Sequence, residues 1–218
     1  MSTLAELRDL VEADLDDAGN AVWTTDEIDR GIQKALREYS QVRPQQVIGT
    51  ITVAAASREV SITTLTGLTR IVRVWHPYTA ASPEDPPEWR RWELWLTTLY
   101  ILDGDTPAIS DVVRVYYNKP QEIEDLESAV ATTVPAEDEE TVIVGAGAYA
   151  ATEKARGSVG EAGVSTDTPQ HWLKWAEAQT AAFKHQLESI RRRESLKIDK
   201  RVPIQDQGWQ RDDLRDGI

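Results

Sequence analysis

Apolar residues recur every three or four positions near both ends of the chain, whereas in the middle they alternate with polar residues. The first spacing is that of an amphipathic helix and the second is that of a β-strand. The pattern therefore predicts helices over about residues 3–42, short strands over about 46–117, and two more helices over about 137–197. We expect an α+β fold in which a small antiparallel β module is inserted into a bundle of two N-terminal and two C-terminal helices.

The two N-terminal helices are predicted to form a hairpin. The apolar stripe of the first consists of Leu4, Leu7, Val11 and Leu15. The segment Asp17-Ala18-Gly19-Asn20 should end this helix, because Gly and Asn tolerate the left-handed backbone found there. Thr24 and Glu27 have the spacing of a capping box at the start of the second helix, and Trp23 and Ile28 occupy the positions of a hydrophobic staple. Both helices need the C-terminal helices to bury their stripes.

The middle of the chain predicts a small antiparallel sandwich or barrel. Its strand patterns are Val47–Val53, Arg58–Ile62, Ile71–Trp75, Trp92–Leu94, Thr98–Leu102 and Val112–Tyr117. The short turn Ala54–Ser57 predicts that the first two strands form a hairpin, and the fourth and fifth strands are predicted to form another.

The C-terminal part predicts two further helices and a tail. Glu137–Glu140 follow Pro135 at a helix start, where carboxylates favour the helix dipole. Thr168 and Pro169 mark the start of the last helix. Its stripe consists of Trp172, Trp175, Ala176, Gln179, Phe183, Leu187 and Ile190. We divide the chain into a helical hairpin (1–44), a β module (45–120), C-terminal helices (121–197) and an extended tail (198–218).

Composition excludes several classes of function. The chain carries 37 acidic and 24 basic residues, a net charge of −13, which disfavours binding of nucleic-acid phosphates. It has no cysteine, so thiol nucleophiles, disulfides and cysteine-held metals are excluded. No apolar run approaches the roughly twenty residues of a membrane span. The acidic N-terminal segment lacks the pattern of a signal peptide.

The segment Thr141–Ala150 resembles the start of a dinucleotide-binding fold, with glycines after an apolar run. Such a fold needs a strand before the glycines and a second strand ending in an acidic residue. Here four carboxylates precede the segment and a Gly-rich stretch follows it. We therefore interpret Gly145–Ala150 as helical residues that permit close packing, and we expect no cofactor. A dinucleotide-binding oxidoreductase that uses Gly145–Ala150 remains an alternative.

No catalytic or metal-binding constellation can be identified. His171 and His185 share a predicted helix but lie about 21 Å apart along it, too far to hold one metal, and His76 is distant from both in sequence. The chain has no Gly-x-Ser-x-Gly motif. Paired carboxylates such as Asp16-Asp17 lie in polar sequence, where we do not expect burial. The sequence therefore predicts a protein that is not an enzyme.

Tryptophan and acidic residues predict two kinds of functional surface. The chain has 8 Trp and 1 Phe, and Trp combines a large apolar area with a polar N–H that suits cores and interface anchors. Trp209 stands alone in the polar tail, which favours an anchor for a partner. The acidic residues of the first helix could line a channel and repel passing DNA. These are Glu6, Asp9, Asp14 and Asp16; the alternative for each is an ordinary solvated face.

The order of elements, together with three segments, resembles the head-tail adaptor proteins of tailed bacterial or archaeal viruses, also called connector or head-completion proteins. The segments are Thr3–Arg8, Val22–Ser40 and Ala131–Pro135. The resemblance covers most of the chain and rests on helix starts, stripes and turns rather than on reactive residues. The β module departs from the smallest members of this family and resembles the inserted modules of larger adaptors.

The resemblance implies a structural virion protein. It would form a homo-oligomeric ring, commonly twelve-fold, beneath the portal protein, with genomic DNA passing through without sequence-specific binding. A downstream neck or tail protein would be the second partner. The tail would dock on the portal through Arg201, Val202, Pro203, Ile204 and Trp209. The protein would be found in the host cytoplasm during assembly and then in the neck of the virion. A stopper or tail-terminator protein is the alternative within the same class.

Overall fold

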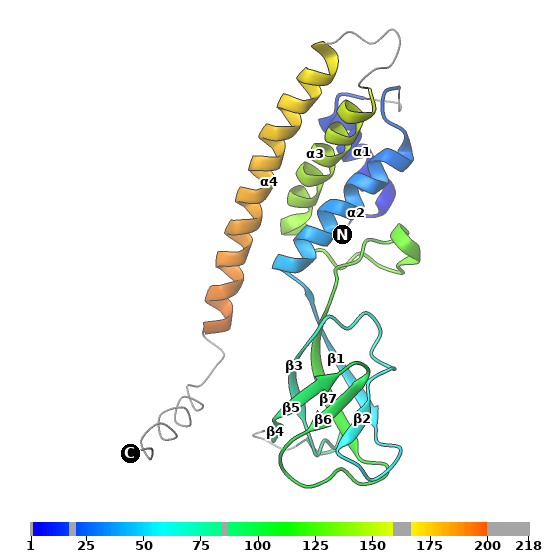
Figure 1. The fold of residues 1–218 in the computed structure, drawn as a ribbon, viewed down its shortest axis with the longest axis vertical. Helices are drawn as coiled ribbons and strands as arrows, with labels where there is room; N and C mark the ends of the chain where they lie inside the picture. Colours follow the sequence, from blue (N-terminus) through cyan, green and yellow to red (C-terminus); the bar gives the residue numbers. More distant parts are fainter. Residues whose placement is uncertain (1, 18–20, 84–86, 159–166, 200–218) are drawn as a thin grey trace, which may run out of the picture. The chain divides into compact units, whose positions relative to one another are not determined.

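The computed structural model describes residues 2–17, 21–83, 87–158 and 167–199. These residues form α-helices and antiparallel sheets, which confirms the predicted α+β class (Figure 1). The described residues divide into two compact units, one within residues 2–7 and 36–137 and the other within residues 8–35 and 138–199. The predicted division into four parts stays a prediction. Among the described helices, none combines the length and apolar character that a membrane span requires.

Capping boxes start both N-terminal helices, α1 (Leu4–Asp14) and α2 (Thr25–Val42). At α2, the Thr24 N–H donates to Glu27 Oε2 at 2.8 Å and the Glu27 N–H donates to Thr24 Oγ1 at 3.3 Å. This reciprocal pair confirms the predicted capping box. Thr3 and Glu6 exchange the same two hydrogen bonds at the start of α1, at 2.9 and 3.3 Å.

The Gly-Ala segment packs helix α3 (Glu139–Gly157) tightly between two others, α2 and α4 (Asp167–Asp199). A Cβ added at Gly145 would lie 2.9 Å from the Ala35 Cβ of α2 and 2.9 Å from the Phe183 ring of α4. A Cβ at Gly31 of α2 would lie 2.6 Å from the Ala146 carbonyl oxygen. These distances confirm the interpretation of Gly145–Ala150 as helical residues that permit close packing.

The predicted stripe of α4 is also confirmed in its main positions. Its buried members are Ala176, Phe183, Leu187 and Ile190. Trp172, Trp175 and Gln179 are half-buried. Tyr149 of α3 meets Phe183 edge to face, with ring centroids 6.3 Å apart. Burial of this stripe against α3 stabilises α4, because helices in proteins gain most of their stability from packing of an apolar face.

Two antiparallel sheets form the β module. Its strands are β1 (Gln45–Thr52), β2 (Glu59–Ser61), β3 (Arg70–Trp75), β4 (Trp89–Arg90), β5 (Trp92–Trp95), β6 (Thr98–Ile101) and β7 (Val112–Lys119). One sheet has the order β1-β7-β3-β4 and the other has the order β2-β6-β5. The predicted β5-β6 hairpin is confirmed, with Trp95 opposite Thr98 and Leu96 in the left-handed region at φ 51°.

The predicted hairpin of the first two strands is wrong. β1 pairs with β7 along its whole length, from Gln45 opposite Lys119 to Thr52 opposite Val112, and β2 pairs with β6. The turn at Ala54–Ser57 therefore carries the chain from one sheet to the other. Inner side chains of both sheets share one apolar core, as a sandwich requires. Its buried members are Ile51, Val53, Val60, Ile62, Leu65, Ile71, Val74, Leu99, Ile101, Val113, Val115 and Tyr117.

The segment Ala131–Pro135 is held by side-chain hydrogen bonds. Thr132 Oγ1 donates to the Ser2 carbonyl at 2.7 Å and accepts the Glu124 N–H at 3.0 Å. Thr133 Oγ1 donates to Gln121 Oε1 at 2.7 Å. The Thr132 hydroxyl thus satisfies backbone groups of Ser2 and Glu124, and the Thr133 hydroxyl satisfies the side-chain amide oxygen of Gln121, as buried polar groups require.

Candidate functional site

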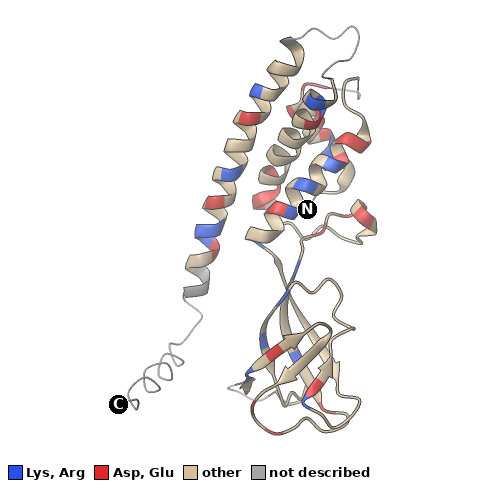
Figure 2. Ribbon diagram, viewed as in Figure 1, with Lys and Arg blue, Asp and Glu red and all other residues tan. Residues whose placement is uncertain are grey.

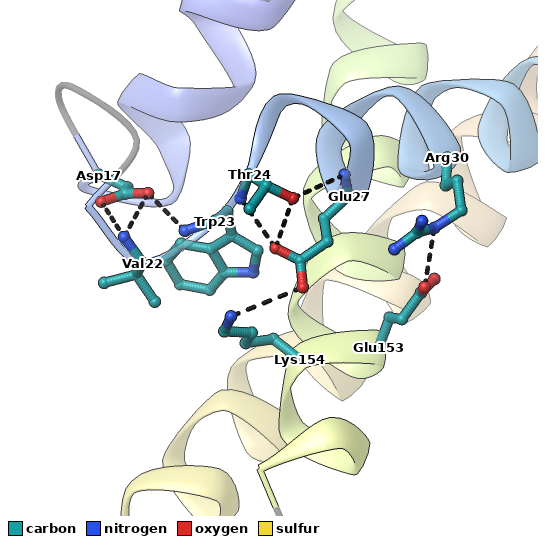
Figure 3. A network of polar contacts seen from close by, with 8 residues as sticks. All are labelled: Asp17, Val22, Trp23, Thr24, Glu27, Arg30, Glu153 and Lys154. Atoms are coloured by element: carbon teal, nitrogen blue, oxygen red, sulfur yellow. Dashed lines mark hydrogen bonds and ion pairs between the residues drawn. The ribbon is translucent and has the colours of Figure 1, made fainter.

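Asp17 closes the junction between α1 and α2. Asp17 is buried, with 3% of its surface exposed. Its carboxylate accepts the backbone N–H groups of Val22 and Trp23 at 2.8–3.1 Å (Figure 3). It also accepts the N–H of Ala21 at 3.0 Å. The expectation that the Asp16-Asp17 pair is not buried was wrong for Asp17, because these three donors compensate for the loss of water around its charge. The carboxylate fixes the path by which the chain enters α2.

Ion pairs fasten the first turns of α2 to the end of α3 (Figure 3). Glu153 accepts Lys34 Nζ at 2.8 Å and Arg30 Nε at 2.9 Å. The hydrogen bond from Lys34 is the largest of the effects that lower the pKa of Glu153 below its ordinary value. Glu27 lies 3.5 Å from Lys154 Nζ. Burial alone would raise the pKa of Glu27, but hydrogen bonds from Thr24 and the charge of Lys154 lower it.

An open cleft of about 370 Å³ lies beside this junction. Its lining residues are Asp14, Leu15, Asp16, Trp23, Ala151, His171, Trp172 and Trp175. Four of these residues, three tryptophans and His171, have aromatic rings. The ring centroids of Trp23 and Trp172 are 5.5 Å apart. Neither a serine, a threonine nor a cysteine lines the cleft in the described part of the chain, so it lacks a nucleophile for hydroxyl or thiol chemistry.

A buried carboxylate joins the start of α3 to the last turns of α4. Asp138 is 2% exposed and accepts two hydrogen bonds from one terminal nitrogen of Arg193, at 2.7 and 2.9 Å. Arg193 is 41% exposed, so one partner of this pair keeps contact with water. The pair holds the distal part of α4 against α3, because separating the two charges would leave Asp138 buried with less compensation.

Aromatic rings and arginines gather on the four-stranded sheet of the β module. Trp75 meets Tyr78 and Trp89 with centroids 5.0 and 6.0 Å apart, and Trp89 meets Tyr116 at 5.4 Å. The guanidinium of Arg114 lies over the rings of Tyr78, Tyr116 and Trp75 at 4.6, 5.6 and 5.9 Å. Trp, Tyr and Arg are the residue types most enriched at protein interfaces.

The predicted channel-facing acidic residues are all on the surface. Glu6, Asp9, Asp14 and Asp16 are exposed. Asp14 and Asp16 line the cleft that Trp23 also lines, whereas Glu6 caps α1. Whether they face a channel stays a prediction. The predicted docking residues of the tail lie outside the described residues. These are Arg201, Val202, Pro203, Ile204 and Trp209.

The described residues contain no cluster of His, Asp and Glu suited to a metal ion. His171 and His185 are exposed on α4. His76 is buried at 3% exposure, and its Nε2 lies 3.1 Å from Asp111 Oδ2. The pKa of Asp111 is lowered, first by the Ala108 N–H and then by His76. Residues 141–150 lie inside α3 rather than at a strand-to-helix turn, so they lack the geometry of a dinucleotide site.

Comparison with known protein families finds a match over most of the chain. The model of a family described as SU10 adaptor protein matches residues 2–202. The match spans both compact units and ends before Trp209. None of the curated proteins matches the chain.

Proposed function

We propose that this chain, which belongs to the SU10 adaptor protein family, forms a ring under the portal and joins the capsid to the tail around the DNA exit channel. The family is one of phage head-tail adaptors, so the protein is a structural adaptor of the virion. The match over residues 2–202 is the observation that carries the proposal, because it covers the helices and the whole β module. The resemblance noted in the sequence is thereby confirmed at the level of the family.

Rigid fastening of the helices supports a place in a ring. A ring closes only when each subunit presents its contact surfaces at a fixed angle to the next. Asp17 fixes the junction of α1 and α2, Glu153 ties α2 to α3, and Asp138 ties α3 to α4. These three carboxylates belong to the same compact unit.

The acidic surface of α1 supports a channel role. Asp9 and Asp14 are exposed carboxylates without an ion pair among the described residues. In this proposal they and their neighbours repel the phosphates of passing DNA, so that the genome meets no cation to bind.

The portal is the proposed upstream partner, and a neck or tail protein is the proposed downstream partner. The tail from residue 198 contains Trp209, a residue type suited to anchoring in a partner's pocket. In this proposal the tail reaches the portal, and binding energy comes in part from that anchor.

The direct test is to mix the full-length protein with purified portal and to measure the mass of the complex by analytical ultracentrifugation. The proposal predicts one species that contains a portal ring and a matching number of copies of this chain. Two separate species would contradict it. Binding to a completed neck but not to portal would instead favour a stopper or tail terminator.

A further inference from the structure

The two sheets of the β module carry charges of opposite sign. The strands of the β1-β7-β3-β4 sheet contain no Asp or Glu. Their basic residues are Arg70, Arg73, Arg90, Arg114 and Lys119. The strands of the β2-β6-β5 sheet contain Glu59 and Glu93 and no Lys or Arg. Figure 2 shows the distribution of both signs along the chain. A basic sheet is unexpected in a chain with a net charge of −13.

Three of these basic residues lie on the outer face of the sheet, namely Arg70, Arg73 and Arg114. Arg90 and Lys119 instead occupy inner-face positions, opposite Val74 and Gln45. Along β7, Val113 and Val115 point into the core, so Arg114 and Tyr116 point outward. Arg73 lies opposite Tyr116 in the register of β3 with β7. Its guanidinium lies 5.0 Å from the centre of the Trp89 ring, which is 41% exposed. We call this surface the basic face.

Three arginines of this sheet have no acidic partner among the residues that the structure describes. Arg90 pairs with Glu88 and Lys119 pairs with Glu122. By contrast, Arg70, Arg73 and Arg114 form no ion pair with any described residue, and Arg114 Nε is buried without a hydrogen-bond partner there. An acidic partner would complete the pairing that the subunit itself leaves open.

The outer face of the second sheet has the complementary chemistry. Glu59 and Glu93 are exposed and lie opposite Tyr100 from its two sides. Trp95, on the same face of β5 as Glu93, is 63% exposed. Arg58 lies next to Glu59 in sequence, but its guanidinium donates to the carbonyls of Ile101 and Gly104. We call this surface the acidic face.

We propose that the basic face of one copy binds the acidic face of the next copy in the ring; this inference rests on the proposed function. Because the two sheets share one core, their outer faces point in opposite directions, which is the arrangement of a head-to-tail contact. Contact between two basic faces would place Arg73 against a second arginine and be repulsive. Trp89 and Trp95 supply aromatic anchors at the two sides of the contact.

Reciprocal charge reversal tests the contact. R70E/R73E makes the basic face acidic and E59K/E93K makes the acidic face basic, so each variant alone should lose portal-bound rings by roughly tenfold or more. An equimolar mixture should recover them, since alternating copies restore opposite charges at every junction. K174E/K184E is the control, because it changes the net charge by the same amount as R70E/R73E but at exposed positions of α4. This variant should assemble normally. Circular dichroism checks that each variant folds.

Thiol crosslinking locates the contact, because the chain has no cysteine of its own. Thr50 is exposed on the basic sheet and Ser61 is exposed on the acidic sheet. When the T50C and S61C variants are mixed in the presence of portal, a short bifunctional thiol reagent should crosslink them into covalent dimers. The T50C variant alone should give no such dimers. Rings that form without this crosslink would overturn the inference and leave the adaptor proposal standing. Failure of the unmodified chain to form rings would overturn both.

Discussion

Gly31 of α2 lies directly against the carbonyl of Ala146 in α3, so closely that a Cβ at Gly31 would be 2.6 Å from that oxygen. No flexible side chain can yield at this point, because the contact is with the backbone of α3. The glycine therefore sets the distance between the two helices that also share the Glu153 ion pairs. A ring subunit depends on such fixed distances, since small changes of angle accumulate around the ring.

Gly31→Ala should destabilise the protein by about 1–3 kcal/mol, because α3 must move to admit the methyl group. In an ordinary helix interior the same change stabilises by about 1 kcal/mol. The free energy of unfolding, measured by urea denaturation, distinguishes the two outcomes. Gly157→Ala is the matched control, since nothing lies within 4 Å of a Cβ there. Equal or increased stability for Gly31→Ala would show that the helices do not meet at this glycine.

Asp17→Ala should lower the free energy of unfolding by about 2–4 kcal/mol, because three backbone N–H groups lose their acceptor in a buried site. Asp14→Ala removes an exposed carboxylate at the end of α1, close to Asp17 in sequence, and should change stability by no more than about 0.5 kcal/mol. Helical circular dichroism during denaturation measures both. A loss at Asp17 no larger than that at Asp14 would contradict the role of Asp17 at the junction.

Stability should fall in acid in part through Glu153. Its pKa in the folded protein lies below its ordinary value of 4.5, chiefly because of the hydrogen bond from Lys34. A carboxyl with a lowered pKa stabilises the fold above its ordinary pKa, and this contribution disappears as the pH falls through the folded value. Unfolding midpoints of the unmodified chain and Glu153→Gln should therefore differ at neutral pH and converge in acid. Glu177→Gln, at an exposed site on α4, should not show this convergence; a constant difference for Glu153→Gln would refute the assignment.

Loss of the tail should weaken portal attachment without unfolding the protein. Deletion of residues 198–218, or Trp209→Ala, removes the proposed anchor, and a buried Trp anchor typically contributes 2 kcal/mol or more to binding, a factor of about thirty. Binding of the variants to immobilised portal and their circular dichroism give the two measurements. Leu173→Ala changes an exposed apolar residue of α4, outside both faces of the β module, and serves as the control for general loss of apolar surface. Unchanged affinity after the deletion would remove the tail from the mechanism.

Local signals in the sequence predicted the helices well. Thr24 and Glu27 form the capping box that their spacing indicated, and Gly145–Ala150 pack as small helical residues. The failed hairpin of β1 and β2 has a physical reason. Ala54–Ser57 is a local turn signal, whereas the choice of β7 and β6 as partners depends on burial between segments far apart in the chain.

The sequence pattern did not indicate residues whose role depends on partners that only the folded chain brings close. Asp17 lies in a polar stretch, and nothing local indicates that the N–H groups of Ala21, Val22 and Trp23 turn toward it. The opposite charges of the two sheets become visible only once strand pairing is known. Gly31 did offer a signal, because a glycine within a helical pattern often marks a close approach of two helices.

Cryo-electron microscopy of the full-length protein mixed with its portal, with particles classified by symmetry, would show whether this chain forms a ring on the portal. We expect a ring of this chain beneath the portal, with α1 toward the channel and each β module in contact with the next. Two results would contradict the proposed ring beneath the portal. In one, the chain binds elsewhere on the portal; in the other, the portal particles carry no density for it.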